Sequence, residues 1–456
     1  MERLTAQNFD RLAKAIMERH GVSYSRAREM LGALHLRLIC GEEIRESAAL
    51  QAALLTAINT GKRAFRGGVT VSLAKNVPLR VPWPGAATLN EVVFALGAKE
   101  DRGTPVGITK SLLFGDAQDM IDANRVVCDG WRAALLPPGV KTTLLAGPDF
   151  ALGGVFAGAF AVAQAFLNAA EISHREISEP VGLSLWRPDL FWLDGNAAGP
   201  PLHSLPAKLW LLGLGHLGQA YGWLLGLLPF SSKTPTTIYL QDFDIVEEGN
   251  WSAGLFCEPR HVGKLKTRLA AEWLELRGFR TRLIERAFDE ETKRSTDEPR
   301  VALCGFDNPE ARQVLEEVGF ELVVDAGLGA SLDHFDRIVL RTFPGASQKA
   351  RGIYRSPAAD VATMNPALFG EADGECGIVF QEIAGKAISS SFTGACASAL
   401  VVSEVLRAMH GGRRREFLSV QLRDLERPSN QYRDENYQLR VARNGSVIVC
   451  ERGTAN

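Results

Sequence analysis

The feature that most constrains this chain is an uncharged run from Leu209 to Phe230 with closely spaced glycines near its start. An apolar stretch leads into Gly213, Gly215 and Gly218 and then into a second apolar stretch. The G-x-G-x-x-G spacing permits a tight turn between a strand and a helix, and lets backbone N–H groups approach a phosphate. The run is long enough to cross a membrane. Glycines gathered at one end favour instead a strand, turn and helix inside an α/β core.

A second β-rich run, Thr237 to Gln241, ends in the acidic stretch Asp242 to Asp244. In a nucleotide-binding α/β sheet, an acid at this place can bind the ribose hydroxyls. The chain continues through Asn250 to Lys266, which the pattern places in the first turn of a helix. The helix dipole disfavours a cation there, so a bound triphosphate would supply the missing negative partner.

A third strand is predicted from Arg300 to Phe306, and Asp307 follows it directly. Ligands of open α/β sheets lie at the carboxyl ends of the strands. Asp307 is a candidate magnesium ligand, because this cation prefers one or two carboxylates together with phosphate oxygens. A dinucleotide-dependent dehydrogenase would explain neither Lys266 nor Asp307, so that interpretation is the weakest.

The ordered motifs G-x-G-x-x-G, D-F-D-I-V, an asparagine, V-G-K-L-K and D-N-x-x-x-R resemble the ThiF/MoeB/ubiquitin-activating superfamily. The resemblance covers roughly residues 205 to 425 and implies a Rossmann-like α/β adenylation fold that uses ATP and Mg²⁺. It also implies the site residues. These are Gly213, Gly215 and Gly218 along the nucleotide, Asp242 at the ribose, Asn250 and Lys266 at the phosphates, and Asp307 at magnesium, with Asp244, Asn308 and Arg312 as further cofactor-binding residues. Lys266 and Asp307 would also be catalytic.

One position departs from the superfamily pattern. The S-N-L-x-R-Q run corresponds here to residues 249–254, so Ala253 replaces the arginine that usually meets the triphosphate. A cation can come from elsewhere in the chain, because only its position matters. Arg260 and any arginine reaching over from the N-terminal half are candidates. Without a substitute, adenylation would be impaired.

The cysteines bear on both location and mechanism. The chain has seven, with no C-x-x-C pair, so the structural zinc of many superfamily members is expected to be missing. The odd, scattered set and the absence of a signal-like N-terminus predict a cytoplasmic location. Cys376 lies in a polar, glycine-bearing loop within residues 344–390, and the resemblance implies that it is a catalytic nucleophile. The alternatives are that Cys376 is an ordinary loop thiol, or that Cys257 is the nucleophile.

The N-terminal part of the chain carries a different pattern. Residues 1–65 are predicted to be helical, with apolar residues at helical spacing in Phe9 to Met17 and Ala27 to Leu38. Further along, two hexads fit F-x-G-A-x-A, Phe156 to Ala161 and Phe392 to Ala397. Their similarity predicts an internal duplication.

In that interpretation, residues 66–180 form a degenerate, inactive ThiF-like half that has lost the glycine loop, the D-x-D and the lysine. A proline-rich linker, 181–206, joins it to an active adenylation domain, 207–456. The alternative is an unrelated accessory domain. Superfamily members work as homodimers or pseudo-dimers, so the resemblance implies a pseudo-dimer within one chain, which could still pair as a homodimer.

The leading functional prediction is an activating enzyme for a ubiquitin-like protein of β-grasp fold. It would adenylate the partner's C-terminal carboxylate, form a thioester on Cys376 and pass the acyl group to a ubiquitin-conjugating-like enzyme, in a bacterial operon with an antiviral defence role. The net charge of −2 gives no excess for binding nucleic acid, and no membrane partner is expected. Two alternatives stay open: a thiol-independent adenylyltransferase acting on a sulfur carrier, a peptide or a small carboxylate, and a nucleotide-binding pseudoenzyme scaffold.

Overall fold

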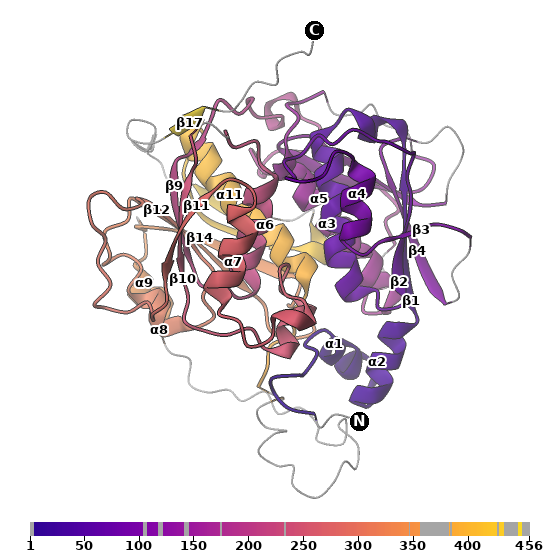
Figure 1. The fold of residues 1–456 in the computed structure, drawn as a ribbon, viewed down its shortest axis with the longest axis horizontal. Helices are drawn as coiled ribbons and strands as arrows, with labels where there is room; N and C mark the ends of the chain where they lie inside the picture. The colour runs from indigo at the N-terminus through magenta and orange to yellow at the C-terminus, as the bar shows by residue number, and fades with distance from the viewer. Residues whose placement is uncertain are drawn as a thin grey trace, which may run out of the picture.

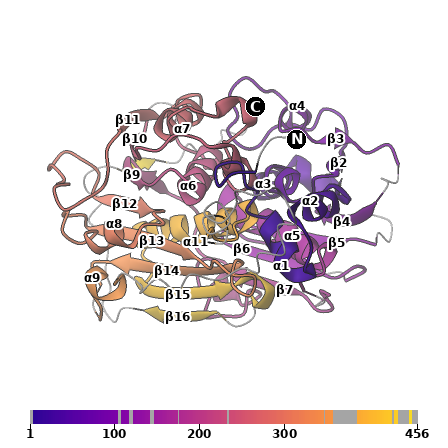
Figure 2. The ribbon, with the colours of Figure 1, turned by 90° about the horizontal axis from the view of Figure 1, so that it is seen from below.

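The computed structural model describes residues 4–103, 107–116, 122–140, 146–173, 176–231, 234–345, 347–355, 383, 385–425, 428–432 and 446–448. In this part of the chain, two large sheets stand on either side of a layer of helices (Figure 1). The same two sheets are separate when the molecule is seen from below (Figure 2). We call residues 34–184 the N-terminal half and residues 208–421 the C-terminal half.

The sheet of the N-terminal half has the strand order β3-β2-β1-β4-β5-β6-β7 within the described residues. Its strands are β1 Leu34–Cys40, β2 Gly68–Ser72, β3 Lys99–Glu100, β4 Ile108–Phe114, β5 Asn124–Cys128, β6 Arg132–Leu136 and β7 Val181–Ser184. The five strands from β3 to β5 are parallel, and β6 and β7 continue the sheet in antiparallel pairings.

The sheet of the C-terminal half has the order β11-β10-β9-β12-β13-β14-β15-β16 in the same described ranges. Its strands are β9 Lys208–Leu212, β10 Thr237–Gln241, β11 Arg280–Ile284, β12 Val301–Cys304, β13 Leu322–Leu328, β14 Arg337–Phe343, β15 Arg415–Gln421 and β16 Ser429–Tyr432. Again the first five are parallel and the rest antiparallel. A separate small pair joins β8 Ser204–Pro206 to β17 Ser446–Ile448.

The helices repeat in the same order in both halves. In the N-terminal half they are α3 Ala48–Ala64, α4 Leu89–Ala95 and α5 Ala151–Ala169, and in the C-terminal half α6 His216–Leu227, α7 Lys266–Glu275 and α11 Ser391–Met409. The C-terminal half adds the short α8 Pro309–Gln313 and α9 Ala350–Ile353, and α1 Ala13–His20 and α2 Tyr24–Gly32 precede the first sheet. Single turns of 3₁₀ helix are η1 Glu42–Arg45, η2 Gly195–Ala197, η3 Glu248–Ser252, η4 Pro259–His261 and η6 Leu422–Asp424. The two halves therefore share one topology.

The hexads that suggested a duplication do not occupy matching places. Phe156 is the sixth residue of α5, whereas Phe392 is the second residue of α11. The hexads are thus one helical turn out of register when each helix is counted from its start. The repeated strand order, and not the hexad, is the observation that relates the halves.

Two sequence predictions about the N-terminal half are wrong. The segment from Ala27 to Leu38 is not one helix, because α2 ends at Gly32 and β1 starts at Leu34. In β1, buried and partly buried residues alternate, the pattern of a strand. The first sheet also extends beyond the predicted limits of 66–180, since it begins with β1 and includes β7 from the expected linker.

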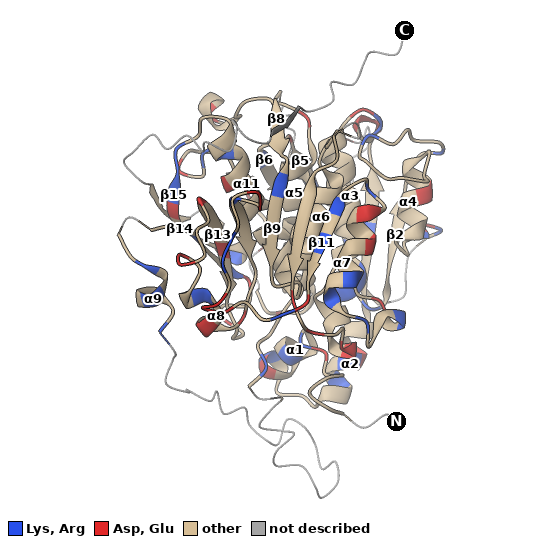
Figure 3. Ribbon diagram, turned by 60° about the vertical axis from the view of Figure 1, so that its left-hand side comes forward, with Lys and Arg blue, Asp and Glu red and all other residues tan. Residues whose placement is uncertain are grey.

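The core contains the long helices α5 and α11, which pack against each other between the sheets. The Phe166 ring of α5 lies 5.6 Å from the Phe392 ring of α11, centroid to centroid. Both helices are long and apolar enough to cross a membrane, but most of their residues are buried inside the protein. Helices α5 and α6 contain no charged residue. Helices α7 and α8 carry both acidic and basic residues (Figure 3). The predicted strand and helix within 209–230 are confirmed as β9 and α6.

Candidate functional site

The glycine-rich turn joins β9 to α6. Gly213 has a φ of 79°, a conformation that favours glycine, and a Cβ there would lie 2.9 Å from the Phe306 side chain. Its N–H donates to the Gln241 carbonyl at 2.9 Å, which ties the turn to β10. A Cβ on Gly218 would lie 2.0 Å from the Gly213 carbonyl oxygen, so Gly218 allows α6 to approach the turn. Gly215 is the N-cap of α6 and supplies no side-chain cap.

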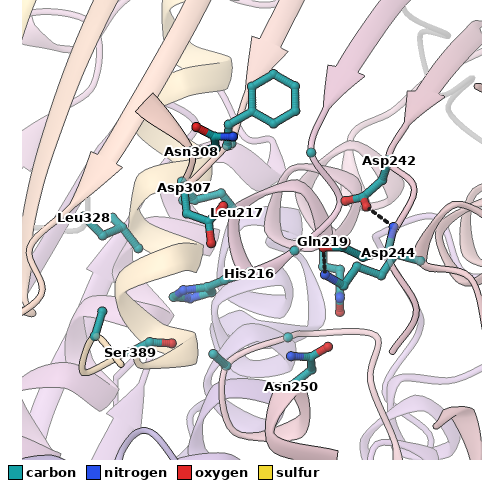
Figure 4. A pocket seen from close by; sticks show the side chains of 18 of the residues that line it. His216, Leu217, Gln219, Asp242, Asp244, Asn250, Asp307, Asn308, Leu328 and Ser389 are labelled. Carbon is teal, nitrogen blue, oxygen red and sulfur yellow. Dashed lines mark hydrogen bonds and ion pairs between the residues drawn. The ribbon is translucent and has the colours of Figure 1, made fainter. Parts of the chain in front are cut away.

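A cavity of about 510 Å³ opens at this turn, where the strands of the C-terminal half end (Figure 4). Most of the predicted cofactor-binding residues line it: Gly213, Gly215, Asp242, Asp244, Asn250, Lys266, Asp307, Asn308 and Arg312. Gly218 does not, because its place is between turn and helix. Cys376 lies outside the residues that the structure describes. The carboxyl ends of β9, β10 and β12 thus bring together groups that are far apart in the sequence.

Asp242 stabilises the glycine-rich turn through hydrogen bonds. One carboxylate oxygen accepts a hydrogen bond from the Leu214 N–H at 2.6 Å, and the other accepts from the Asp244 N–H at 2.8 Å. Burial raises the pKa of Asp242, while the charge of Lys266 and these hydrogen bonds act in the opposite direction. Each oxygen has two lone pairs, so Asp242 can still accept a hydroxyl from a ligand.

Lys266 begins α7, as the sequence predicts, but it has a partner in the protein. Its Nζ lies 2.7 Å from Oδ2 of Asp244, whose side chain is 52% exposed. An ion pair with one partner half in water contributes little to stability. A phosphate could therefore replace Asp244 at the Lys266 ammonium group with little loss of free energy.

The two asparagines at the cavity also have local structural roles. The Asn250 Oδ1 accepts from the Glu247 N–H at 3.0 Å within a capping box of η3. The Asn308 Oδ1 accepts from the Glu310 N–H at 2.8 Å as the N-cap of α8. Each cap uses the amide oxygen, which leaves the side-chain N–H₂ group as a donor for a ligand.

Arg312 is held mainly by its own half of the protein. Its Nη2 donates to the Ala326 carbonyl at 2.7 Å, and its Nε lies 3.2 Å from Oδ1 of Asp325, a buried acid. Burial alone would lower the pKa of Arg312, but Asp325 and other groups that favour the charged form outweigh it together, and the pKa is raised. The guanidinium is largely neutralised by Asp325, so it fastens α8 to β13 as well as lining the cavity.

Two further arginines line the cavity, Arg11 and Arg286. Arg11 comes from the N-terminal part of the chain, from which a substitute arginine was expected, whereas Arg286 was not predicted. Arg286 follows β11, so the rule that ligands lie at strand ends could have found it. Arg11 lies before α1 in the N-terminal part of the chain, and no local signal marks it. The predicted substitute Arg260 does not line the cavity, and its Nε contacts the His261 ring instead.

Cys257, the second predicted nucleophile, does not line this cavity. It is 1% exposed, and its Sγ is hydrogen-bonded by the Gln219 side chain at 3.2 Å. Burial raises the pKa of the Cys257 thiol, which opposes formation of the nucleophilic thiolate. Cys257 therefore has the properties of a structural thiol.

Comparison with known sequences places this architecture in a family. Residues 35–185 match the BilD N-terminal domain, and residues 205–412 match the BilD C-terminal domain. The bacterial E1-like protein BilD of Collimonas sp. (strain OK412) is 36% identical over 433 residues, which cover 91% of this chain and 92% of that protein. This chain belongs to the BilD family of bacterial E1-like proteins. The limits of the two BilD domains follow the two halves of the structure.

Among solved structures, the BilD-family chain is similar to a crystal structure of E. coli MccB with ATP, at 15% identity and a TM-score of 0.35. That match covers 49% of this chain and 63% of the MccB chain, less than two thirds. A second match is E. coli tRNA N6-threonylcarbamoyladenosine dehydratase TcdA, at 15% identity, a TM-score of 0.30, and coverage of 44% and 84%. The predicted membership of the ThiF/ubiquitin-activating superfamily and the α/β fold are confirmed.

Proposed function

We propose that this BilD-family protein uses ATP to adenylate the C-terminal carboxylate of a ubiquitin-like protein. One observation carries the proposal: the glycine turn, Asp242, Lys266 and Asp307 come from four separate segments and line one cavity. A turn with exposed backbone N–H groups, an acid for ribose and cations for phosphates are the parts that ATP requires. The E1-like name of the Collimonas relative fits the same chemistry.

In the proposed reaction, a carboxylate oxygen of the partner attacks the α-phosphorus of ATP. The bond from the α-phosphorus to the oxygen bridging to the β-phosphate breaks, pyrophosphate leaves, and an acyl-adenylate remains. The protein's contribution is to hold the reactants in line and to neutralise charge. Lys266, Arg11 and Arg286 supply positive charge at the cavity, and the latter two stand in for the arginine missing at Ala253.

The acids of the cavity fit a magnesium ion bound together with ATP. Asp307 is an exposed carboxylate at the end of β12, whereas Asp242 is engaged by backbone N–H groups and Asp244 by Lys266. One carboxylate plus phosphate oxygens and water suits this cation. Asp307 would hold it, and the ion would neutralise charge on the phosphate oxygens.

We further propose that Cys376 receives the acyl group. Its thiolate would attack the acyl carbon, AMP would leave, and the resulting thioester would pass to the cysteine of a conjugating enzyme. The support is the position of Cys376 in a polar, glycine-bearing stretch of the sequence ahead of α11, together with the burial of the alternative nucleophile Cys257. The N-terminal half would be an inactive duplicate, which makes the chain a pseudo-dimer.

The test is an intact-mass measurement of the protein with MgATP and a small β-grasp protein encoded beside it. We expect an adduct of the partner's mass that thiols remove and that Cys376→Ala abolishes, while Cys257→Ala, a matched control, retains it. AMP formation without an adduct would favour the thiol-independent adenylyltransferase. ATP binding without AMP or pyrophosphate would favour the scaffold, and would contradict the proposed activity.

A further inference from the structure

The two halves differ at the helix that follows the first strand of each sheet. In the N-terminal half that helix is α3, and Asp149 binds its start: Oδ2 accepts from the Ala48 N–H at 2.7 Å and Oδ1 from the Ala49 N–H at 2.8 Å. The Ser47 hydroxyl also donates to Asp149, at 2.9 Å. A carboxylate of the protein itself thus occupies the site where a helix N-terminus attracts anions.

Within the described part of the chain, no such acid caps the corresponding helix of the C-terminal half, α6. Its N-cap is Gly215, no side chain caps it, and its first turn contains no acidic residue. The first turn of α6 stands at the cavity, which Gly215, His216 and Leu217 line. On its own, an open helix start would not identify a ligand group.

The topology shows which residue stands in the place of Asp149. Asp149 lies two positions before Ala151, the first residue of α5. Ser389 lies two positions before Ser391, the first residue of α11, the equivalent helix. The His216 imidazole at the start of α6 is hydrogen-bonded to the backbone of Ser390, so the segment before α11 touches the start of α6.

Ser389 has an unsatisfied hydroxyl at the cavity. The residue is only 9% exposed, its Oγ is buried, and this oxygen has no hydrogen-bond partner among the residues that the structure describes. Ser389 lines the cavity together with His216 and Asp307 (Figure 4). A buried polar group without a partner is unfavourable, and a ligand oxygen would supply one.

We infer that the Ser389 hydroxyl binds a phosphate oxygen of the nucleotide, and that a serine in the place of the Asp149 carboxylate keeps the start of α6 open to that phosphate. This inference rests on the proposed ATP-dependent function. In the N-terminal half, the Asp149 carboxylate before α5 already binds the start of α3. In the C-terminal half, Ser389 precedes α11, so the start of α6 remains open to a phosphate. The Ser389 hydroxyl adds a hydrogen-bond donor next to that helix start.

The experiment measures ATP affinity by isothermal titration calorimetry on the full chain. Ser389→Ala removes one hydrogen bond to a charged group and should weaken ATP binding about tenfold. Ser389→Asp places the N-terminal half's carboxylate against the triphosphate and should weaken it at least about 100-fold. The asparagine of Ser389→Asn has nearly the same volume as the aspartate of Ser389→Asp but no charge. The Ser389→Asn variant should therefore bind ATP at least about tenfold more tightly than Ser389→Asp. Asp149→Asn should change ATP affinity by less than about twofold.

Thermal unfolding of each variant checks that the affinities are compared on folded protein. If Ser389→Asp fails to fold, Ser389→Ala, which only removes an atom, still tests the inference. Equal ATP affinity of wild type, Ser389→Ala and a folded Ser389→Asp would overturn the inference while leaving the proposed function intact. If the ATP affinities of wild type and the Ser389 variants follow the expected order but wild type forms no AMP, the inference is supported and the proposed function is contradicted. A wild type that does not bind ATP would overturn both.

Discussion

The N-terminal and C-terminal halves share one strand order but differ in the surroundings of the acids that follow their strands. Beyond β4, Asp116 lies 3.6 Å from the guanidinium of buried Arg125, and its N–H donates to the Glu43 carboxylate at 2.8 Å. Beyond β12, Asp307 lies instead at an open cavity. The comparison teaches that a shared topology does not by itself leave groups open to a ligand. An acid and a helix start must also face a cavity, as Asp307 and the start of α6 do.

The largest expected effect is on catalysis, from Asp307→Ala. Loss of the carboxylate that would hold magnesium should lower the rate of ATP–pyrophosphate exchange by at least about 100-fold. Asp116→Ala, the corresponding change in the N-terminal half, should leave the exchange rate within about twofold. Radiolabelled pyrophosphate exchange in the presence of the acyl partner measures both. Similar losses in the two variants would remove the distinction between the halves.

A second prediction concerns the contact between the halves. Arg63 of α3 is fully buried, and it donates to the carbonyls of Trp251, Leu255 and Cys257 at 3.1–3.2 Å, in the loop that follows Asn250. Arg63→Ala leaves these carbonyls unpaired and should lower the free energy of unfolding by about 3 kcal/mol. Urea denaturation measures the change.

The control is Arg26→Ala, which breaks an exposed pair with Glu29 and should change stability by less than about 1 kcal/mol. If the Arg63 variant were as stable as the Arg26 variant, the N-terminal half would not be holding the loop beside the nucleotide cavity.

A third prediction uses pH to probe the start of α6. Burial lowers the pKa of His216 from 6.5 to about 4, so the folded protein excludes a proton that the unfolded chain binds between these values. Stability from this group is complete above pH 6.5 and is lost as the pH falls toward 4. Between about pH 6.5 and about pH 4.5 the loss should be roughly 2 kcal/mol.

His216→Gln should remove that part of the pH dependence, as measured by urea denaturation at several pH values. His334→Gln, at an exposed position, is the control and should leave the profile unchanged. Identical pH profiles for wild type and His216→Gln would show that the imidazole is not held neutral against α11.

The smallest expected effect is that of Asp244→Asn. The Asp244 side chain of the pair with Lys266 is half exposed, so loss of the pair should change the free energy of unfolding by less than about 1 kcal/mol. In the N-terminal half, Asp129 and Arg132 form a buried pair at 2.7 Å, and Asp129→Asn should destabilise by roughly 3 kcal/mol. Equal losses would mean that Lys266 depends on Asp244 and is not available to a phosphate.

Much of the site could be predicted because its motifs are local. The glycine turn, Asp242, Lys266 and Asp307 each lie within a few residues of the end of a strand or the start of a helix, and the chain order places those ends along one edge of a sheet. Arg286 was missed although it follows β11 in the same way. The strand β1 was mistaken for helix because its apolar residues also fit helical spacing when read together with those of α2.

The α/β class and the candidate nucleotide-binding motifs of the C-terminal half could be predicted from the sequence, since both are properties of short segments with their own turn and strand chemistry. Which acids and helix starts are open to a ligand depends instead on how distant segments pack. Arg11 reaches the cavity from the other end of the chain, Asp149 closes α3 from 101 residues away, and Ser389 stands at the cavity's edge. The reason is physical: whether a polar group is satisfied depends on its neighbours in space, which no local pattern records.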